Sequence, residues 1–361
     1  MARYVKKEKG HKRKLILMGI FVNAAFAFMI VAIGLLVVDG LLNEKRIETL
    51  VSGGYSVIVP ENTSHFSVTH DNKVYSYVEN GKLIVKFTTG NQTITEITES
   101  NPVIFATSME DRNIIVYFTY GDEGNKTTSK STNYGKDGDL IKNLGKDTVT
   151  IHSYDTDRKT STSQHKFSVK DLIKIDSVEF SSLTNMIYIN AKVGTSDATA
   201  TNTIYEANIT DRVYQIKSDI KIKKIANINT DVGVYYQTEK NNIYFNNSKI
   251  TPVKSEAKGY NLIGSDDTDN VYLQSIMTPT LIYKIKDKKV VGKIDIVDTA
   301  FVATRSTNNG VFLVYGDRVV NIAKPAKEEI MFYEGTKYLD VFTNRLYMVS
   351  EQRQVSFRSV Q

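Results

Sequence analysis

The residues that could do chemistry are few, and they do not form a known catalytic set. The chain has no cysteine, which excludes disulfides, thiolate zinc sites and cysteine nucleophiles. Because HExxH and close His/Asp/Glu clusters at zinc-ligand spacing are absent, we expect the histidines to be structural or solvent-facing. His65 and His70, five positions apart along one expected strand, point to opposite faces of it. The five histidines are His11, His65, His70, His152 and His165.

Other motifs for nucleophilic catalysis or phosphate binding are also missing, including GxSxG, GxGxxG and GxxxxGK[ST]. Acidic residues gather in segments 137–139, 155–157 and 266–270, and such oxygen-rich loops can hold calcium. However, the EF-hand glycine and glutamate are absent, and Asp and Asn also suit β-turns. We therefore expect turns, with calcium binding as the weaker alternative. The sequence predicts no catalytic residue, cofactor or metal ligand.

The excess positive charge of the chain lies in its N-terminal tail, residues 1–14. The 361 residues include 46 Lys and Arg and 40 Asp and Glu, a net charge of +6. The tail holds seven of the basic residues and one acidic residue, Glu8. The remaining chain therefore has 39 of each sign (46 − 7 and 40 − 1). A nucleic-acid-binding domain needs a basic face, so we expect no nucleic-acid partner.

An uncharged segment of 24 residues, Leu15–Val38, follows this basic tail. As a helix it would extend roughly 36 Å, enough to cross a bilayer. Basic residues are retained on the cytoplasmic side, so we expect residues 1–14 inside the cell and the rest outside. Ala25-Phe26-Ala27 has the form of a signal-peptidase site, but eleven more apolar residues follow it, which favours a retained anchor in membrane lipid.

Asn23 is the one strongly polar residue of this segment, and two interpretations of it remain open. With Gly19 and Ala27 it could pair the helix with another membrane helix. Alternatively, its amide bonds to its own helix backbone. Residues 39–54 are expected to form a juxtamembrane helix and a linker that ends at Ser52-Gly53-Gly54.

The remaining residues, 55–361, contain a repeat. A polar turn is followed by an apolar and then an aromatic residue, at intervals of 42, 71, 47, 37, 40 and 35 residues. The long interval contains a polar insert, Gly121–Asp147, and without it that interval is 44. A period near 40 with four strands per unit is typical of β-propeller blades. The seven pairs are Val74-Tyr75, Val116-Tyr117, Ile187-Tyr188, Val234-Tyr235, Val271-Tyr272, Val311-Phe312 and Leu346-Tyr347.

The two ends of this domain complement each other. The last unit has three expected strands and lacks a fourth, whereas Tyr55–Val59 is a spare strand before the first unit. Pairing the two would close the ring and remove exposed edges. We therefore predict an all-β fold, a seven-bladed β-propeller preceded by one transmembrane helix, with six or eight blades or a β-sandwich pair as alternatives. Expected strands include His65–Thr69, Asn261–Gly264, Val271–Ser275, Arg345–Ser350 and Arg353–Arg358.

The repeats resemble the degenerate blades of quinoprotein-like or YVTN-type propellers across residues 55–361. The Trp-Asp dipeptide of WD40 repeats is missing, since the chain has no tryptophan. The layout is also similar to that of membrane-anchored propeller proteins of clostridia and related Gram-positive bacteria. This resemblance implies a fold and a location, and it assigns no functional residue.

The expected function is that of a non-enzymatic, membrane-anchored extracytoplasmic scaffold in a cell-envelope complex for division, wall assembly or sporulation. Two alternatives stay open: an enzyme acting on envelope glycans or peptides at the propeller channel, and a ligand sensor that regulates a membrane partner. The ligand itself is not predictable. The insert is either a surface loop or an arm that binds a partner protein through its sizeable apolar residues, Tyr134, Leu140, Ile141 and Leu144.

Overall fold

The computed structural model describes residues 57–61, 63–89, 93–121, 147–208, 213–254, 258–324, 329–342 and 345–359. All of them belong to one compact unit, Ser56–Gln361. None of these residues forms a helix that could cross a bilayer. The predicted tail, transmembrane helix and linker (1–54) lie outside the described residues, as do Gly19, Asn23 and Ala27. The apolar residues of the insert, Tyr134, Leu140, Ile141 and Leu144, also lie outside them.

The described strands form seven four-stranded antiparallel sheets, each made of strands consecutive in the chain except the last. Blade 1 consists of β2 (Thr63–Val68), β3 (Val74–Glu79), β4 (Lys82–Phe87) and β5 (Thr93–Ile97). Blade 2 consists of β6 (Val103–Ser108), β7 (Ile114–Gly121), β8 (Thr148–Asp155) and β9 (Thr160–Ser168). Blade 3 consists of β10 (Leu172–Ser181), β11 (Met186–Val193), β12 (Thr201–Asn208) and β13 (Val213–Ile220).

Blades 4 to 7 follow in the same order. Blade 4 consists of β14 (Ile222–Asn227), β15 (Val234–Thr238), β16 (Ile243–Phe245) and β17 (Ser248–Ile250), and blade 5 of β18 (Tyr260–Ser265), β19 (Val271–Ser275), β20 (Leu281–Lys286) and β21 (Lys289–Asp295). Blade 6 consists of β22 (Ala303–Thr307), β23 (Gly310–Val314), β24 (Arg318–Asn321) and β25 (Glu329–Met331). Blade 7 combines β26 (Thr336–Phe342), β27 (Arg345–Ser350) and β28 (Gln354–Ser359) with β1 (Val57–Ile58) from the start of the domain.

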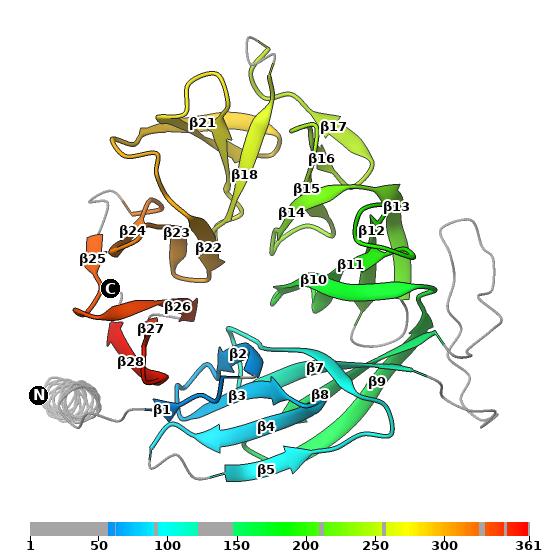
Figure 1. Cartoon of the computed structure of the whole chain (residues 1–361). Coiled ribbons are helices and arrows are strands. Elements are labelled where there is room, and N and C mark those ends of the chain that lie inside the picture. The colour runs from blue at the N-terminus through cyan, green and yellow to red at the C-terminus, as the bar shows by residue number, and fades with distance from the viewer. Residues whose placement is uncertain are drawn as a thin grey trace, which may run out of the picture. The chain divides into compact units, whose positions relative to one another are not determined.

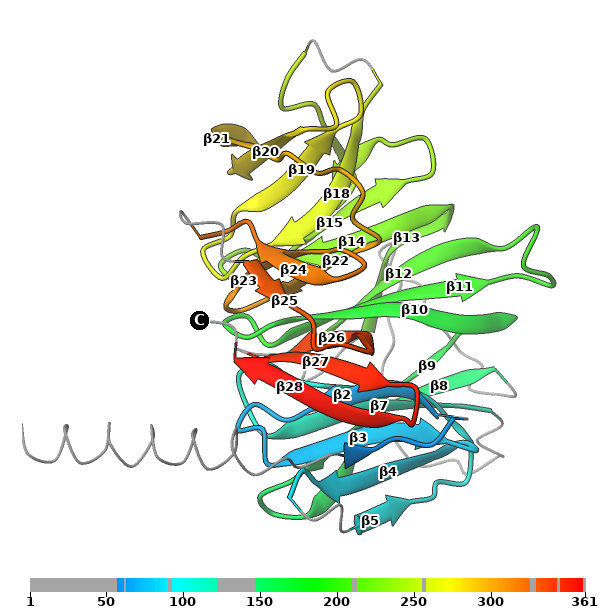
Figure 2. The ribbon, with the colours of Figure 1, turned by 60° about the vertical axis from the view of Figure 1, so that its left-hand side comes forward.

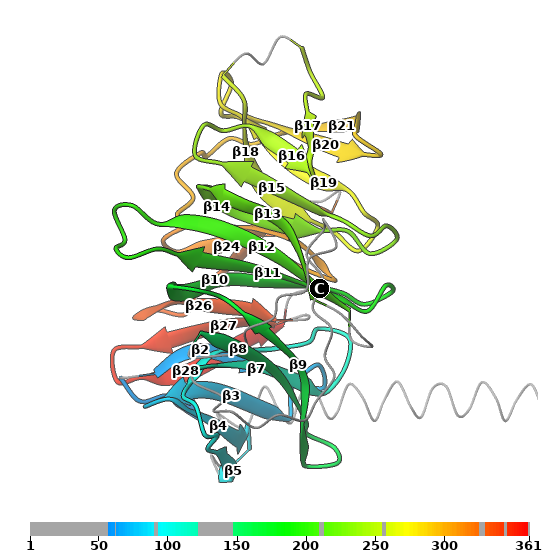
Figure 3. The same ribbon diagram turned by 90° about the vertical axis from the view of Figure 1, so that its right-hand side faces the viewer.

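The seven sheets are arranged as a closed ring around a central axis (Figure 1). The first strand of each blade contacts the first strand of the next, in the order β2, β6, β10, β14, β18, β22, β26 and back to β2. Views from the side show the sheets stacked face to face around the ring (Figures 2 and 3). The prediction of a seven-bladed propeller is confirmed, and the six-bladed, eight-bladed and sandwich alternatives are wrong.

The repeated apolar–aromatic pair lies within the first four residues of the second strand of every blade. Neighbouring residues of a strand point to opposite faces, and each blade is covered on both faces, so both members of the pair are buried. Val74, for example, packs in the cluster between blades 1 and 2, whereas Tyr75 packs between blades 7 and 1. One such apolar cluster lies at each of the seven interfaces between neighbouring blades.

The ring closes through strands from both ends of the domain. β1 pairs with β28 in blade 7, with Val57 opposite Val355. Beyond the ladder, the Val59 amide donates to the Arg353 carbonyl at 3.1 Å. In return, the Arg353 guanidinium donates to the carbonyls of Val59 (3.1 Å) and Pro60 (3.2 Å). The predicted closure is confirmed: the paired strand is Val57–Ile58 among the described residues, and residues 55 and 56 of the expected Tyr55–Val59 lie outside them.

Most expected strand boundaries agree with the observed ones to within two residues, and Val271–Ser275 and Arg345–Ser350 match in full. β2 differs because its pairing with β3 shifts register between Ser64 and Ser67. His65 lies in this bulge with a left-handed backbone (φ 55°). The strand continues through this bulge and spans Thr63–Val68, two residues earlier at its start and one at its end than expected. The insert connects β7 to β8, and its residues 122–146 lie outside the described ranges.

Candidate functional site

The turns between the first and second strands of the blades gather on one face of the ring, because every first strand runs in the same direction along the channel. We call this the channel face, made of residues 69–73, 109–113, 182–185, 228–233, 266–270 and 308–309. The corresponding turn of blade 7, residues 343–344, is outside the described ranges.

Side chains of these turns connect neighbouring blades. Asn113 Oδ1 accepts a hydrogen bond from the Asp71 amide (3.1 Å). Asn229 Oδ1 accepts from the Ser182 amide (3.3 Å), and Asp269 Oδ1 accepts from the Asn229 amide (2.6 Å). Because each bond joins successive blades, the channel face is a preformed surface held by the ring itself.

The acidic segment 266–270 forms such a turn. Asp266 accepts hydrogen bonds from the Thr268 and Asn270 amides (both 3.0 Å) and from the Tyr272 hydroxyl (2.7 Å). Burial acts to raise the pKa of Asp266, but these hydrogen bonds together hold that pKa below its usual value. Segment 155–157 is similar, since Asp155 accepts from the Asp157 amide (3.0 Å). Segment 137–139 lies outside the described residues.

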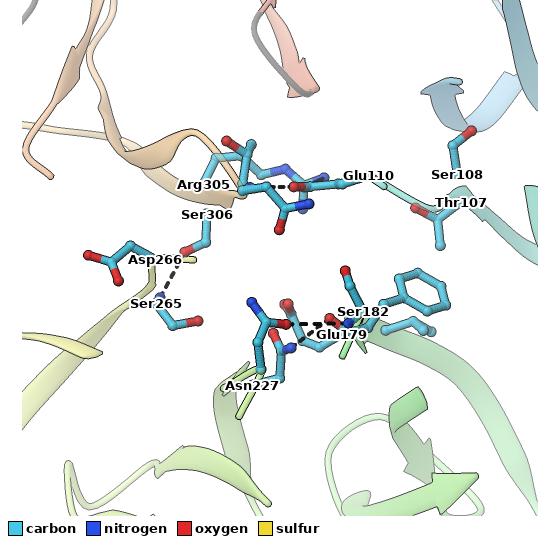
Figure 4. Close-up of a pocket in the computed structure, with 15 residues that line it drawn as sticks. Thr107, Ser108, Glu110, Glu179, Ser182, Asn227, Ser265, Asp266, Arg305 and Ser306 are labelled. Atoms are coloured by element: carbon cyan, nitrogen blue, oxygen red, sulfur yellow. Dashed lines mark hydrogen bonds and ion pairs between the residues drawn. The ribbon is translucent and has the colours of Figure 1, made fainter. Parts of the chain in front are cut away.

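A small polar cavity of about 60 Å³ lies at the channel face, inside the ring. It has room for several water molecules. Residues of blades 2 to 6 line it, and Figure 4 shows Arg305 and Glu110 on one side and Glu179, Ser182 and Asn227 on the other. The lining residues that carry the argument are Glu110, Glu179, Ser182, Asn227, Asn229 and Arg305.

Arg305, on β22, connects blade 6 to its neighbours around and across the channel. Its Nε lies 3.1 Å from Asp340 Oδ1 and also donates to the Val341 carbonyl at 3.3 Å. Its Nη2 lies 3.9 Å from Glu110 Oε1, and the guanidinium covers the Phe342 ring. Burial raises the pKa of Asp340, and the opposite charge of Arg305 limits that rise.

Glu110 reaches across the channel from blade 2 to blade 6. Its Oε2 accepts a hydrogen bond from the Asn308 amide at 2.6 Å, and its own carbonyl lies 2.5 Å from His70 Nδ1. Desolvation raises the pKa of Glu110 to about 7, against the charge of Arg305 and the Asn308 hydrogen bond, which lower it. The Glu110 side chain keeps 20% of its surface exposed.

Lys224, on β14, extends past blade 5 to blade 6. Its ammonium group donates to the Ile263 carbonyl (2.5 Å), to the Thr304 carbonyl (3.5 Å) and to the Thr304 hydroxyl. Burial lowers the pKa of Lys224 to about 8, and the negative charge of Glu179 opposes that change. The acceptors of these hydrogen bonds are all uncharged oxygens.

Glu179, on β10, is the remaining carboxyl group of the cavity. It makes no hydrogen bond and no salt bridge with any residue that the structure describes. Burial raises its pKa, and the charges of Arg305 and Lys224 partly counteract this. Figure 4 shows Glu179 near Ser182 and Asn227, across the cavity from Arg305 and Glu110.

The histidines lie elsewhere, and within the described residues none lines the cavity. His65 packs against Phe105, with ring centroids 4.4 Å apart. His152 is buried in blade 2 between the hydroxyls of Thr119 and Ser163 and stacks on Tyr117. Among the described residues, no cluster of three or more His, Asp and Glu side chains is arranged to hold a metal ion.

Sequence reasoning did not find the channel cluster. Glu110, Glu179, Lys224, Arg305 and Asp340 come from five blades and share no local motif. One signal in the sequence could have indicated this cluster. Strands covered on both faces are mostly apolar, so a charged residue within the first strand of a blade, such as Glu179 or Arg305, points to a polar site inside the ring.

Comparisons with known proteins add little to this site. No family model and no curated protein matches the chain. Three solved structures show low similarity. They are Saccharomyces cerevisiae Sqt1 (9% identity, 83% of this chain and 84% of that chain, TM-score 0.46) and a chain of the Mitotic Checkpoint Complex (10%, 84% and 92%, 0.48). The third is PorZ, a surface component of the type-IX secretion system of Porphyromonas gingivalis. It has 12% sequence identity and a TM-score of 0.49, and the match covers 85% of this chain and 38% of that chain. Similarity at this level carries no argument about function.

Proposed function

We propose that this protein is a non-enzymatic, single-pass membrane protein whose propeller lies outside the cytoplasm and holds a partner protein of a cell-envelope complex on its channel face. The anchor and its direction rest on the uncharged segment 15–38 and the basic residues before it. A closed ring suits such a role, because a rigid surface loses little conformational entropy when a partner binds.

The observation that carries this proposal is a pair of exposed apolar side chains on turns whose other residues, Ser182 and Asn229, line the cavity. Leu183 is 70% exposed and Val232 is 49% exposed. They lie in the channel-face turns of blades 3 and 4, which the hydrogen bond from Ser182 to Asn229 joins. Burial of these two side chains against a partner would remove apolar surface from water, which favours binding at these turns.

The alternative of an enzyme in the channel has one observation in its favour, the convergence of carboxyl groups there. Arg305 engages two of them, Glu110 and Asp340, which leaves Glu179 without a second acid or base assigned to act with it. General acid–base chemistry on glycans normally uses two free carboxyl groups, one on each side of the bond. We therefore favour binding over catalysis.

Site-specific photo-crosslinking in the native membrane tests the proposal. A photoreactive residue would replace Leu183 or Val232 in the full chain. The matched control is Val291, on β21, which is also apolar and 56% exposed but lies outside the channel face. We expect a discrete crosslinked protein at positions 183 and 232 and none at 291. Equal products at all three positions, or none at all, would refute the proposed surface.

The predicted location needs a separate measurement. The absence of cysteine makes every introduced thiol unique. We expect a membrane-impermeant maleimide to label Lys240→Cys in intact cells but to label Ala2→Cys only after lysis. The reverse pattern would place the propeller in the cytoplasm.

A further inference from the structure

The channel cluster contains one more negative charge than positive charge when all its groups are ionised. Its carboxyl groups are Glu110, Glu179 and Asp340, and its cations are Lys224 and Arg305. Arg305 is engaged by Asp340 and Glu110, and Glu110 also accepts the Asn308 amide. Within the part of the chain that the structure describes, the Glu179 carboxyl group makes no hydrogen bond and no ion pair, and only the more distant charges of Arg305 and Lys224 act on it.

Neither nearby cation is placed to pair with Glu179. Lys224 directs its hydrogens at the carbonyls of Ile263 and Thr304 and at the Thr304 hydroxyl. Arg305 is held by Asp340 and by stacking on Phe342. Glu179 is partly buried, so its carboxylate keeps only part of its hydration, and taking up a proton or binding a cation would stabilise it. The raised pKa of Glu179 is the first of these responses.

The surroundings of Glu179 offer hydrogen-bond acceptors for a cation. Asn227 donates its amide hydrogen to the Phe180 carbonyl at 2.6 Å, which leaves its side-chain oxygen to accept. The Ser182 hydroxyl lines the same part of the cavity. An ammonium group has three donors and no acceptor, and it is about the size of a water molecule, so the cavity of about 60 Å³ can take it.

We propose that the channel cavity binds a primary ammonium group, with Glu179 as its counter-ion and Asn227 and Ser182 as further acceptors. The source of this group is a lysine side chain of the partner protein, so the identity of the ligand rests on the proposed function. Leu183 and Val232, exposed at the neighbouring turns, would contact the apolar part of that side chain and its neighbours in the partner.

Calorimetry on the full chain in detergent tests the site without knowledge of the partner. The probes are methylammonium and a blocked lysine amide, each titrated at pH 8. The neutral Nε-acetyl form of the lysine amide serves as the control ligand. We expect both amines to bind and the acetylated form not to bind. Glu179→Gln should weaken binding on the order of tenfold or more, the usual effect of losing a charge-assisted hydrogen bond.

The matched control variant is Glu239→Gln, on the opposite face, where the carboxylate lies 4.0 Å from Lys221. It should bind the amines as the wild type does. The urea midpoint of Glu179→Gln should equal or exceed that of the wild type, since an unpaired carboxyl group is removed, so a loss of binding cannot be attributed to unfolding.

The pH dependence distinguishes this site from nonspecific charge attraction. A protonated Glu179 cannot act as a counter-ion, so affinity should fall as the pH decreases through its raised pKa. Glu179→Gln should reduce that dependence to the part that the titration of Glu110, which lines the same cavity, contributes. Equal binding by both variants, equal binding of the acetylated ligand, or binding of sodium as tight as that of methylammonium would each overturn the proposal.

Failure of this proposal is separable from failure of the proposed function. Crosslinks at Leu183 and Val232 without amine binding would refute the ammonium site and leave the scaffold role in place. Amine binding without any crosslinked partner would support the site and refute the scaffold role.

Discussion

Replacing Glu110 by glutamine should change how the stability of the propeller depends on pH. The pKa of Glu110 is about 7 in the folded chain, against an ordinary value of 4.5. A carboxyl group with a raised folded pKa binds its proton more tightly when folded. Its stabilising contribution is therefore complete below about pH 4.5 and is lost as the pH rises through about 7.

The size of the effect follows from the shift. A difference of about 2.5 pKa units at about 1.36 kcal/mol per unit corresponds to about 3 kcal/mol between the two ends of the range. The glutamine side chain keeps an oxygen that can accept the hydrogen bond of the Asn308 amide, but it does not titrate. We expect wild type and Glu110→Gln to differ little at pH 5, and the variant to be about 3 kcal/mol more stable at pH 8.

Pulse proteolysis in urea measures this on the full chain in detergent, because it reports the folded fraction without tryptophan fluorescence. The matched control is Glu239→Gln on the opposite face, which should change the free energy of unfolding by less than about 0.5 kcal/mol at either pH. Parallel pH profiles for wild type and Glu110→Gln would refute the description of Glu110 as a desolvated carboxyl group in the channel.

Two further substitutions test the packing and the charge cluster. Val59→Ala removes two methyl groups from a side chain that is 2% exposed, so it should destabilise the fold by about 2 kcal/mol, whereas Val291→Ala, at 56% exposure, should cost less than about 0.5 kcal/mol in the same urea assay. Equal midpoints for these two variants would show that the N-terminal strand is not packed. Arg305→Met leaves Asp340 and Glu110 without their cation and should destabilise the fold by about 3 kcal/mol at pH 8. The loss of stability should become smaller toward pH 5, because Glu110 and Asp340 have raised pKa values and take up protons there. A loss of stability that does not depend on pH would argue against the charge cluster.

The blades could be predicted because a sheet covered on both faces leaves a local record in the sequence. Val271 and Tyr272 are adjacent, yet one packs between blades 4 and 5 and the other between blades 5 and 6. A chain that repeats this requirement at each second strand shows a regular period, which is the length of one blade. Closure was predictable for a related reason, since blade 7 had three strands and Val57–Ile58 had no other neighbour.

The channel cluster was not predictable in the same way. Arg305 meets Asp340 of the next blade and Glu110 from across the ring, and only the closed ring brings these residues together. Bulges had no clear signal either, as with the register shift at His65. Turn residues such as Asn113 and Asp269 were correctly placed in turns, but their bonds to neighbouring blades depend on how the sheets stack.

Closure of the ring by both termini supports every other inference, and engineered thiols test it most directly. Val57 and Val355 are direct partners in the β1–β28 ladder, and the chain has no other cysteine to interfere. Antiparallel partners have Cα separations of about 4.5–5.5 Å, which a disulfide can bridge. The bond would close a loop that contains almost the whole propeller, which is visible as faster migration on a non-reducing gel. We expect Val57→Cys/Val355→Cys to form this bond under mild oxidation and Val57→Cys/Val291→Cys not to form it. A failure of the first pair, or equal oxidation of both, would contradict the closed ring.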